Sequence, residues 1–244
     1  MPKFIIANWK SNHNLDSAWD WVETVNSYLT GHKKEGVEVI LAPPFSLIAG
    51  LAVQIQGSPL KLAVQDLSQF EAGSYTGQVC AQNLEGLFIG SAILGHSERR
   101  HHLNEADDDV AMKAKEAVKA GIRPIVCVDQ PYLQSQFEAL DKEGIDLLES
   151  ELIVAYEPLA AIGSGKAADV GQTTKVIEQI RDLYSSAVIY GGSVDEKNVK
   201  QYLEISDGVL VGTASLEADS FIGLLEAVWF SIMIRKNDAK KTKN

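Results

Sequence analysis

The chain has 244 residues, 45% of them hydrophobic and 23% charged, which excludes a disordered protein and provides material for a large core. Its 22 Lys and Arg residues against 33 Asp and Glu residues give a formal net charge of −11, which argues against nucleic acid as a partner. The first residues become polar too soon for a signal peptide, and no run of about eighteen apolar residues follows. We therefore expect a cytoplasmic protein with no membrane segment.

Eight short apolar runs recur along the chain, mostly continuous rather than alternating. This pattern is typical of strands that are buried on both faces of a parallel sheet. The sequence predicts strands at residues 4–7, 37–42, 62–64, 88–94, 124–128, 152–156, 187–190 and 209–211.

The segments between these runs have helical periodicity. The first predicted helix has Asp16 or Ser17 as its candidate cap and one apolar stripe, made of Ala18, Trp21, Val22, Val25 and Leu29.

A later helix is predicted over residues 104–120, with acidic residues early, lysines late and Gly121 as its stop. Its expected apolar stripe is Ala106, Val110, Ala114, Ala117 and Val118.

Strand and helix alternate without a linker or a change in composition, so we expect residues 1–244 to form one domain. Eight βα units can close into a (β/α)8 barrel of about 250 residues with eight parallel strands. An open doubly wound sheet often has a glycine-rich first turn, whereas the turn at residues 8–12 contains no glycine. The predicted fold is therefore a single-domain α/β barrel.

In such a barrel the chemistry lies at the carboxyl ends of the strands. The polar or turn-forming residues predicted at these ends are Asn8, Lys10, His96, Glu157, Ser193, Gly212 and Thr213. Together they could supply an amide, a cation, an imidazole, a carboxylate and a cradle for an anion.

Each charged candidate also has a purely structural interpretation. Lys10 could be a solvated rim residue or a fixed cation for an anionic substrate. His96 could be an ordinary loop histidine, or it could precede a helix at residue 97, whose amino terminus would keep the ring neutral. Glu157 could be a rim charge or a general base.

Residues 161–168 combine glycines with small residues at both ends, which indicates a lid with hinges. The segment lacks the spacing of a Walker A loop, which removes the main support for nucleotide binding. The glycines near Ser193 and Gly212 either make tight turns or expose N–H groups to a phosphate. Cys80 and Cys127 have no CxxC spacing, and the adjacent His101 and His102 cannot share a helix face, so we expect no metal site.

Taken together, five segments resemble triosephosphate isomerases in order and spacing over essentially the whole chain. They are Asn-Trp-Lys at 8–10, Gly-His-Ser-Glu-Arg-Arg at 95–100, Ala-Tyr-Glu-Pro at 155–158, Ala-Ile-Gly-Ser-Gly-Lys at 161–166 and Tyr-Gly-Gly-Ser-Val at 190–194. The resemblance implies an isomerase of glycolysis and gluconeogenesis that interconverts dihydroxyacetone phosphate and D-glyceraldehyde 3-phosphate through an enediol(ate), without a cofactor.

The resemblance also implies the roles of individual residues. Glu157 would be the base, His96 a neutral proton donor, and Lys10 and Asn8 would stabilise developing charge. Glu98 would support these residues without contacting the substrate itself. The residues implied for phosphate binding are Gly163, Ser193, Gly212 and Thr213.

The long loop from Asp66 to Gln78 resembles the family's dimer loop and implies a homodimer in which Thr76 faces the partner's site. Ser11 stands where the family usually has Met in the receiving pocket. Ala160 replaces the usual Trp of the lid, and Asp129-Gln130 replaces Gly-Glu. We expect these departures to alter lid motion and subunit affinity more than the reaction class.

Two alternatives remain open from the sequence. The first is a Schiff-base aldolase that uses Lys10, and the second is a non-catalytic barrel that binds phosphosugars.

Overall fold

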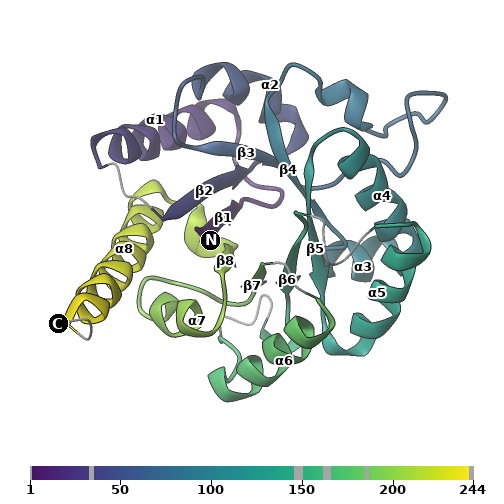
Figure 1. Cartoon of the computed structure of the whole chain (residues 1–244). Coiled ribbons are helices and arrows are strands. Elements are labelled where there is room, and N and C mark those ends of the chain that lie inside the picture. The colour runs from purple at the N-terminus through teal and green to yellow at the C-terminus, as the bar shows by residue number, and fades with distance from the viewer. Residues whose placement is uncertain (1, 33–35, 146–150, 162–165, 185–186, 242–244) are drawn as a thin grey trace.

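A computed structural model describes residues 2–32, 36–145, 151–161, 166–184 and 187–241. Eight parallel strands close into a barrel in sequence order, and helices surround it (Figure 1). The barrel closes because β1 (Lys3–Asn8) pairs with β8 (Gly208–Val211) as well as with β2 (Val37–Ala42). The predicted fold class is confirmed.

The other strands lie within one residue of their predicted limits. They are β3 (Lys61–Val64), β4 (Ile89–Leu94), β5 (Arg123–Val128), β6 (Ile153–Tyr156) and β7 (Val188–Tyr190).

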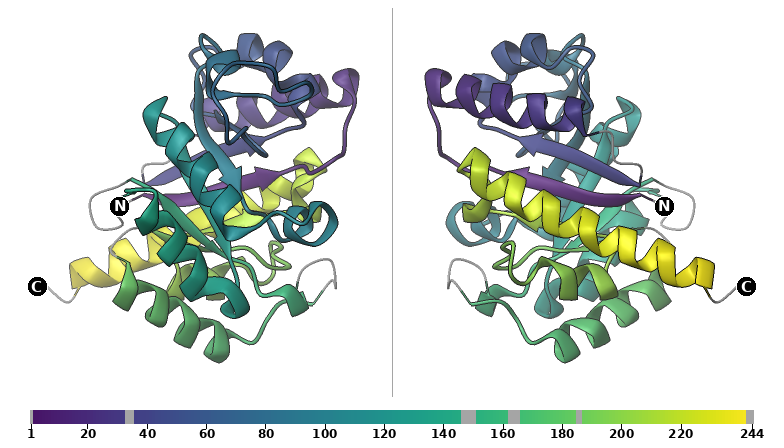
Figure 2. Two further views of the ribbon diagram at one scale, coloured as in Figure 1. Left: turned by 90° about the vertical axis from the view of Figure 1, so that its right-hand side faces the viewer. Right: turned by 90° about the vertical axis from the view of Figure 1, so that its left-hand side faces the viewer.

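The helices form the outer layer, and Figure 2 shows them covering the barrel from two sides. The α-helices are α1 (Leu15–Gly31), α2 (Phe45–Gln54), α3 (Ser97–Leu103), α4 (Asp107–Lys119), α5 (Leu133–Lys142), α6 (Val170–Leu183), α7 (Val199–Ile205) and α8 (Ala218–Lys241). In the described part of the chain, four short 3₁₀ helices follow strands or loops: η1 (Ala81–Leu84), η2 (Gln130–Tyr132), η3 (Leu159–Ala161) and η4 (Thr213–Ser215).

The strands are buried on both faces, which explains their continuous apolar runs. In β1, Phe4 and Ile6 belong to the cluster inside the barrel, whereas Ile5 and Ala7 belong to the cluster between the strands and the helices. This alternation follows from the two-residue period of a strand. Packing inside the barrel and packing against the helices therefore hold the strands in place, with their carboxyl ends together at one end of the barrel.

The start of α1 differs from the prediction. Its cap is Asn14, whose side-chain oxygen accepts the N–H of Ser17 at 3.0 Å, while the Ser17 hydroxyl accepts the N–H of Asn14 at 3.2 Å. This reciprocal capping box places Asp16 and Ser17 inside the first turn. The five predicted stripe residues of α1 are all buried.

The helix predicted over residues 104–120 is in fact preceded by a separate helix. Asn104 adopts a left-handed conformation (φ 54°) and ends α3, and α4 begins only at Asp107. Ala106 and Val118 were wrongly placed in the buried stripe, because Ala106 lies before the helix and is exposed and Val118 is 47% exposed. The predicted stop at Gly121 agrees with its φ of 71°.

Residues 66–78 form the predicted long loop between β3 and η1, without helix or strand. Within this loop the rings of Phe70 and Tyr75 stack at 4.2 Å, although both side chains are more than one-third exposed. Among the described residues, none of the helices combines the length and the apolar character that a membrane span requires.

Candidate active site

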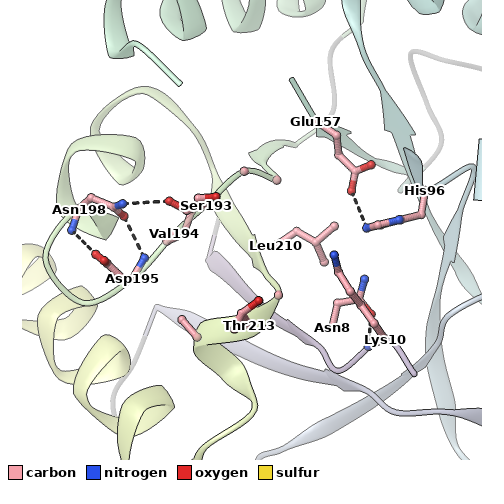
Figure 3. Close-up of a pocket in the computed structure, with 14 residues that line it drawn as sticks. Asn8, Lys10, His96, Glu157, Ser193, Val194, Asp195, Asn198, Leu210 and Thr213 are labelled. Atoms are coloured by element: carbon pink, nitrogen blue, oxygen red, sulfur yellow. Dashed lines mark hydrogen bonds and ion pairs between the residues drawn. The ribbon is translucent and has the colours of Figure 1, made fainter. Parts of the chain in front are cut away.

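A pocket of about 400 Å³ opens at the carboxyl ends of the strands. Seven predicted site residues line it: Asn8, Lys10, His96, Glu157, Ser193, Gly212 and Thr213. Figure 3 shows His96 and Glu157 on one side of the pocket and Ser193 and Thr213 on the other. Asn8 and Thr213, which are far apart along the chain, therefore meet in one cavity.

Lys10 is held by its main chain in an unusual conformation. Its φ is 53°, which is sparsely populated by residues other than glycine. Its N–H donates to Asn8 Oδ1 at 3.0 Å, and its carbonyl accepts from Gln65 Nε2 at 2.9 Å. These bonds fix the backbone, so that the Lys10 ammonium reaches the pocket and forms an ion pair with Glu98. A strained backbone held in this way is a frequent feature of functional sites.

His96 immediately precedes α3 and acts as its cap. Its Nδ1 accepts the N–H of Glu98 at 3.2 Å. Because an accepting Nδ1 carries no proton, this bond assigns the ring proton to Nε2 and makes the imidazole neutral. The sequence prediction that a helix begins at residue 97 is confirmed.

Glu157 follows β6 directly and is only 1% exposed. Its N–H donates to the Val128 carbonyl at 2.8 Å, which extends the pairing of β5 with β6 by one residue. Its Oε2 accepts the N–H of Ser97 at 3.0 Å, and its Oε1 lies 3.3 Å from His96 Nε2. The carboxylate and the donor nitrogen of the imidazole thus face each other (Figure 3).

Cys127 lies inside the barrel close to Glu157. Burial raises the pKa of the Cys127 thiol well above its usual value, and the nearby Glu157 charge adds to this shift. The thiol therefore stays protonated and places no second negative charge beside the carboxylate.

The opposite wall is formed by the turns after β7 and β8. A Cβ at Gly191 would lie 2.9 Å from Glu157 Cγ, and a Cβ at Gly212 would lie 3.4 Å from Lys10 Cε. Ser193 Oγ donates to the Ala161 carbonyl at 2.7 Å, so this hydroxyl holds the segment after Glu157. Because glycine has no side chain, this wall can lie close to the wall that carries Glu157 and Lys10.

Two predicted features lie partly or wholly outside the described residues. Gly163 lies outside the described residues, as does the centre of the predicted lid, residues 162–165. At the far end of that segment, the N–H of Ala168 donates to the Tyr190 hydroxyl at 3.0 Å.

Sequence reasoning missed several polar residues that shape the pocket. Gln65 bonds the carbonyls of both Lys10 and Ala42, and Asn198 Nδ2 donates to the Ser193 carbonyl at 2.9 Å. Gln65 directly follows β3, so the strand-end rule that found Asn8 could have found it. Nothing in the local sequence marks Asn198, which sits at the start of α7.

The described part of the chain contains no group of three or more His, Cys, Asp or Glu side chains placed to hold a metal ion. The ionisable groups of the pocket are an ammonium, an imidazole and carboxylates. These groups can transfer protons and stabilise negative charge.

The closed βα repeat and a polar pocket at the carboxyl ends of its strands place the protein in the class of (β/α)8 barrels, whose active sites lie at this end. Comparisons with known proteins narrow this class. The family model for triosephosphate isomerase matches residues 3–228. The chain belongs to the triosephosphate isomerase family.

Curated relatives support this assignment over nearly their full lengths. The chain is 38% identical to the triosephosphate isomerase of Mesomycoplasma hyorhinis, with 91% of this chain and 96% of that protein covered. It is 38% identical to that of Dehalococcoides mccartyi strain BAV1 (92% and 96% covered) and 35% identical to that of Alkaliphilus oremlandii (92% and 99% covered).

Proposed function

We propose that this chain is an isomerase that interconverts dihydroxyacetone phosphate and D-glyceraldehyde 3-phosphate. The observation that supports this most directly is the 3.3 Å approach of Glu157 Oε1 to the Nε2 of His96 inside the pocket at the carboxyl ends of the strands. A base and a neutral donor at this distance can act on neighbouring atoms of one small substrate.

Glu157 is the base of the proposed reaction. It removes a proton from the carbon beside the carbonyl, which leaves an enediolate, and returns a proton to the neighbouring carbon. Its burial and its bond to the Ser97 N–H hold the carboxylate in the pocket wall, so that little reorganisation precedes proton transfer.

His96 and Lys10 stabilise the oxygen atoms of the enediolate. His96 donates from Nε2 because its Nδ1 is occupied by the Glu98 N–H. The Lys10 ammonium and the Asn8 amide line the same pocket and supply positive charge and hydrogen bonding to developing negative charge. Glu98 pairs with Lys10 and supports the cation from outside the reacting atoms.

The phosphate group fits the wall formed after β7 and β8. Gly212 caps the short helix η4 and Thr213 begins it, so their backbone N–H groups lie at a helix amino terminus, where an anion can bind. Ser193 contributes from the turn after β7, and Gly163, outside the described residues, completes the proposed set. This arrangement attracts a phosphate locally in a chain whose net charge is −11.

No cofactor is needed for this chemistry, because proton transfer between adjacent carbons leaves the substrate's overall oxidation state unchanged. The Schiff-base alternative is disfavoured, since the Lys10 nitrogen is engaged in an ion pair with Glu98, whereas a Schiff base requires a free amine. A non-catalytic barrel is disfavoured because the base and the imidazole are both present and in contact.

An isomerase assay with purified protein tests the proposal. Glyceraldehyde 3-phosphate is supplied, and the dihydroxyacetone phosphate formed is reduced by a coupling dehydrogenase with NADH. We expect turnover by the unmodified protein and almost none by a Glu157→Gln preparation, which controls for host isomerase. Equal rates in the two preparations would contradict the proposal.

We also propose a homodimer formed through the loop 66–78, with Thr76 directed at the partner's site. Tyr75 and its stacked neighbour Phe70 expose apolar surface on this loop. Because Ser11 and Gln78 are polar, we expect the dimer to weaken on dilution or with changes in salt. Sedimentation velocity that shows one tight dimer at nanomolar protein would contradict this expectation.

The cellular setting completes the proposal. We place the protein in the cytoplasm, in glycolysis and gluconeogenesis, with triose phosphate as its small-molecule partner and neither nucleic acid nor membrane as a ligand. We further propose that residues 1–244 form one domain, since the family match already spans residues 3–228.

A further inference from the structure

The main chain around Glu157 is held from the neighbouring strand β5 and from the loop that follows it. Up to Glu157, ordinary sheet bonding is sufficient, because Glu157 donates its N–H to the Val128 carbonyl at 2.8 Å. The next residue is Pro158, which has no N–H. Hydrogen bonding to β5 along the sheet therefore ends at the N–H of Glu157, the proposed base.

After the end of the sheet, a side chain accepts the next hydrogen bond from the main chain. Asp129 Oδ2 accepts the N–H of Leu159 at 3.2 Å, and Oδ1 accepts the N–H of Gln130 at 2.8 Å. The Asp129 residue is only 7% exposed. Among the described residues, Asp129 forms no ion pair with a Lys, Arg or His. The donors to its carboxylate are the backbone N–H groups of Gln130 and Leu159.

The Leu159 bond connects two loops that are far apart in the chain. Asp129 and Leu159 are separated by 30 positions, and the bond joins the turn after β5 to the turn after β6. Two further bonds fix the same turn, from Ala161 N–H to the Pro158 carbonyl at 2.8 Å and from Ser193 Oγ to the Ala161 carbonyl at 2.7 Å. Glu157 thus lies between a strand bond on one side and a bonded turn on the other.

We propose that Asp129 is a positioning residue for Glu157: its carboxylate replaces the missing sheet bond at Pro158 and fixes the turn that carries the base. This inference rests on the proposed function of Glu157. An aspartate at this position supplies a charged acceptor, and such bonds are stronger than those to a neutral carbonyl. Asp129 does not line the pocket and touches no reacting atom.

The competing explanation is that Asp129 only caps the short helix η2 through its bond to the Gln130 N–H. Asp129→Ser separates the two roles. A serine side chain can still cap a helix start, but its hydroxyl is one bond shorter and does not reach the Leu159 N–H. Asp129→Ala removes both bonds.

Asp109→Ala is the matched control. Asp109 Oδ2 also accepts a backbone N–H, that of Ala106 at 3.0 Å, at the start of α4 and outside the pocket lining. Its removal costs a similar local bond without affecting the turn after Glu157.

Two measurements are made on the full-length protein: kcat and KM in the isomerase assay, and hydrogen exchange of the Leu159 amide. For Asp129→Ser we expect kcat to fall about 10-fold with KM changed less than about twofold, because a small misplacement of a catalytic group costs rate more than binding. We expect the Leu159 amide to exchange at least about 10-fold faster. Asp109→Ala should change neither quantity.

The proposal is overturned if Asp129→Ser leaves kcat unchanged, whatever happens to exchange at Leu159. It is also overturned if kcat falls while Leu159 exchange stays the same, since the carboxylate would then act by another route. The exchange measurement needs no activity, and the unmodified protein is assayed first, so a failure of the isomerase assignment itself is recognised separately.

Discussion

The two walls of the pocket are built differently. The wall from β1, β4 and β6 presents charged or ionisable side chains, each held by a further polar contact: Lys10 by its ion pair with Glu98, His96 by the Glu98 N–H and Glu157 by the Ser97 N–H. The wall from β7 and β8 presents turns in which glycine leaves room for its neighbours, as at Gly191 and Gly212. In the proposed reaction the first wall, called the chemical wall below, supplies the reacting groups, and the second wall supplies space and backbone N–H groups. We therefore expect substitutions in the two walls to impair the enzyme in different ways.

The largest effect is expected on the chemical wall. Glu157→Asp shortens the side chain by one methylene and withdraws the carboxylate from His96 Nε2, now 3.3 Å away. We expect kcat to fall at least about 10²-fold with KM changed little. Steady-state kinetics measure this, and unchanged turnover would remove Glu157 as the base.

A smaller loss is expected at the tightest point between the walls. In Gly191→Ala the new Cβ would lie 2.9 Å from Glu157 Cγ, which is too close for either group to stay in place. We expect kcat to fall about 10-fold because the base is displaced. A variant with normal kcat would show that the Glu157 side chain tolerates displacement.

Gly212→Ala is the matched substitution on the same wall. Its Cβ would meet Lys10 Cε at 3.4 Å, which is close to ordinary contact distance, and the residue has a negative φ of −88°. We expect kcat to change less than about threefold, with the larger part of any effect in KM. If Gly212→Ala were more damaging than Gly191→Ala, crowding of Glu157 would not explain the difference.

The smallest effect concerns stability beneath the chemical wall. Folding raises the pKa of the Cys127 thiol, so above about pH 8.5 the thiol ionises in the unfolded chain but not in the folded one. Stability from this group is complete below that pH and is lost as the pH rises. Between pH 7 and 9.5 the unmodified protein should lose about 1 kcal/mol more unfolding free energy than Cys127→Ala.

Urea unfolding at the two pH values measures this difference, and Cys80 is present in both proteins, so its contribution cancels. Parallel losses of unfolding free energy in both proteins would contradict the expected linkage.

The strands were predictable because a parallel barrel buries both of their faces and leaves continuous apolar runs in the sequence. Helix ends were less predictable. Asn14 was missed as a cap because Asp16 and Ser17 are equally good capping residues, and only the reciprocal bond between Asn14 and Ser17 decides among them. The turn at Asn104 required a left-handed residue that composition does not reveal.

The placement of the chemical wall followed from the strand-end rule, since Asn8, His96 and Glu157 each stand at the end of a predicted strand. The supporting bonds did not follow. Gln65 and Asp129 act by reaching main-chain groups 55 and 30 positions away, and no local pattern encodes which distant N–H or carbonyl a side chain meets.

The most direct test of the account follows the hydrogen that the base removes. Glyceraldehyde 3-phosphate is incubated with the unmodified protein in deuterium oxide, and the dihydroxyacetone phosphate is analysed by proton NMR. If Glu157 carries the proton between carbons while His96 serves the oxygens, product molecules should contain deuterium at the carbon that receives the proton. Complete retention of the original hydrogen at normal turnover would indicate direct transfer between the carbons and contradict the account.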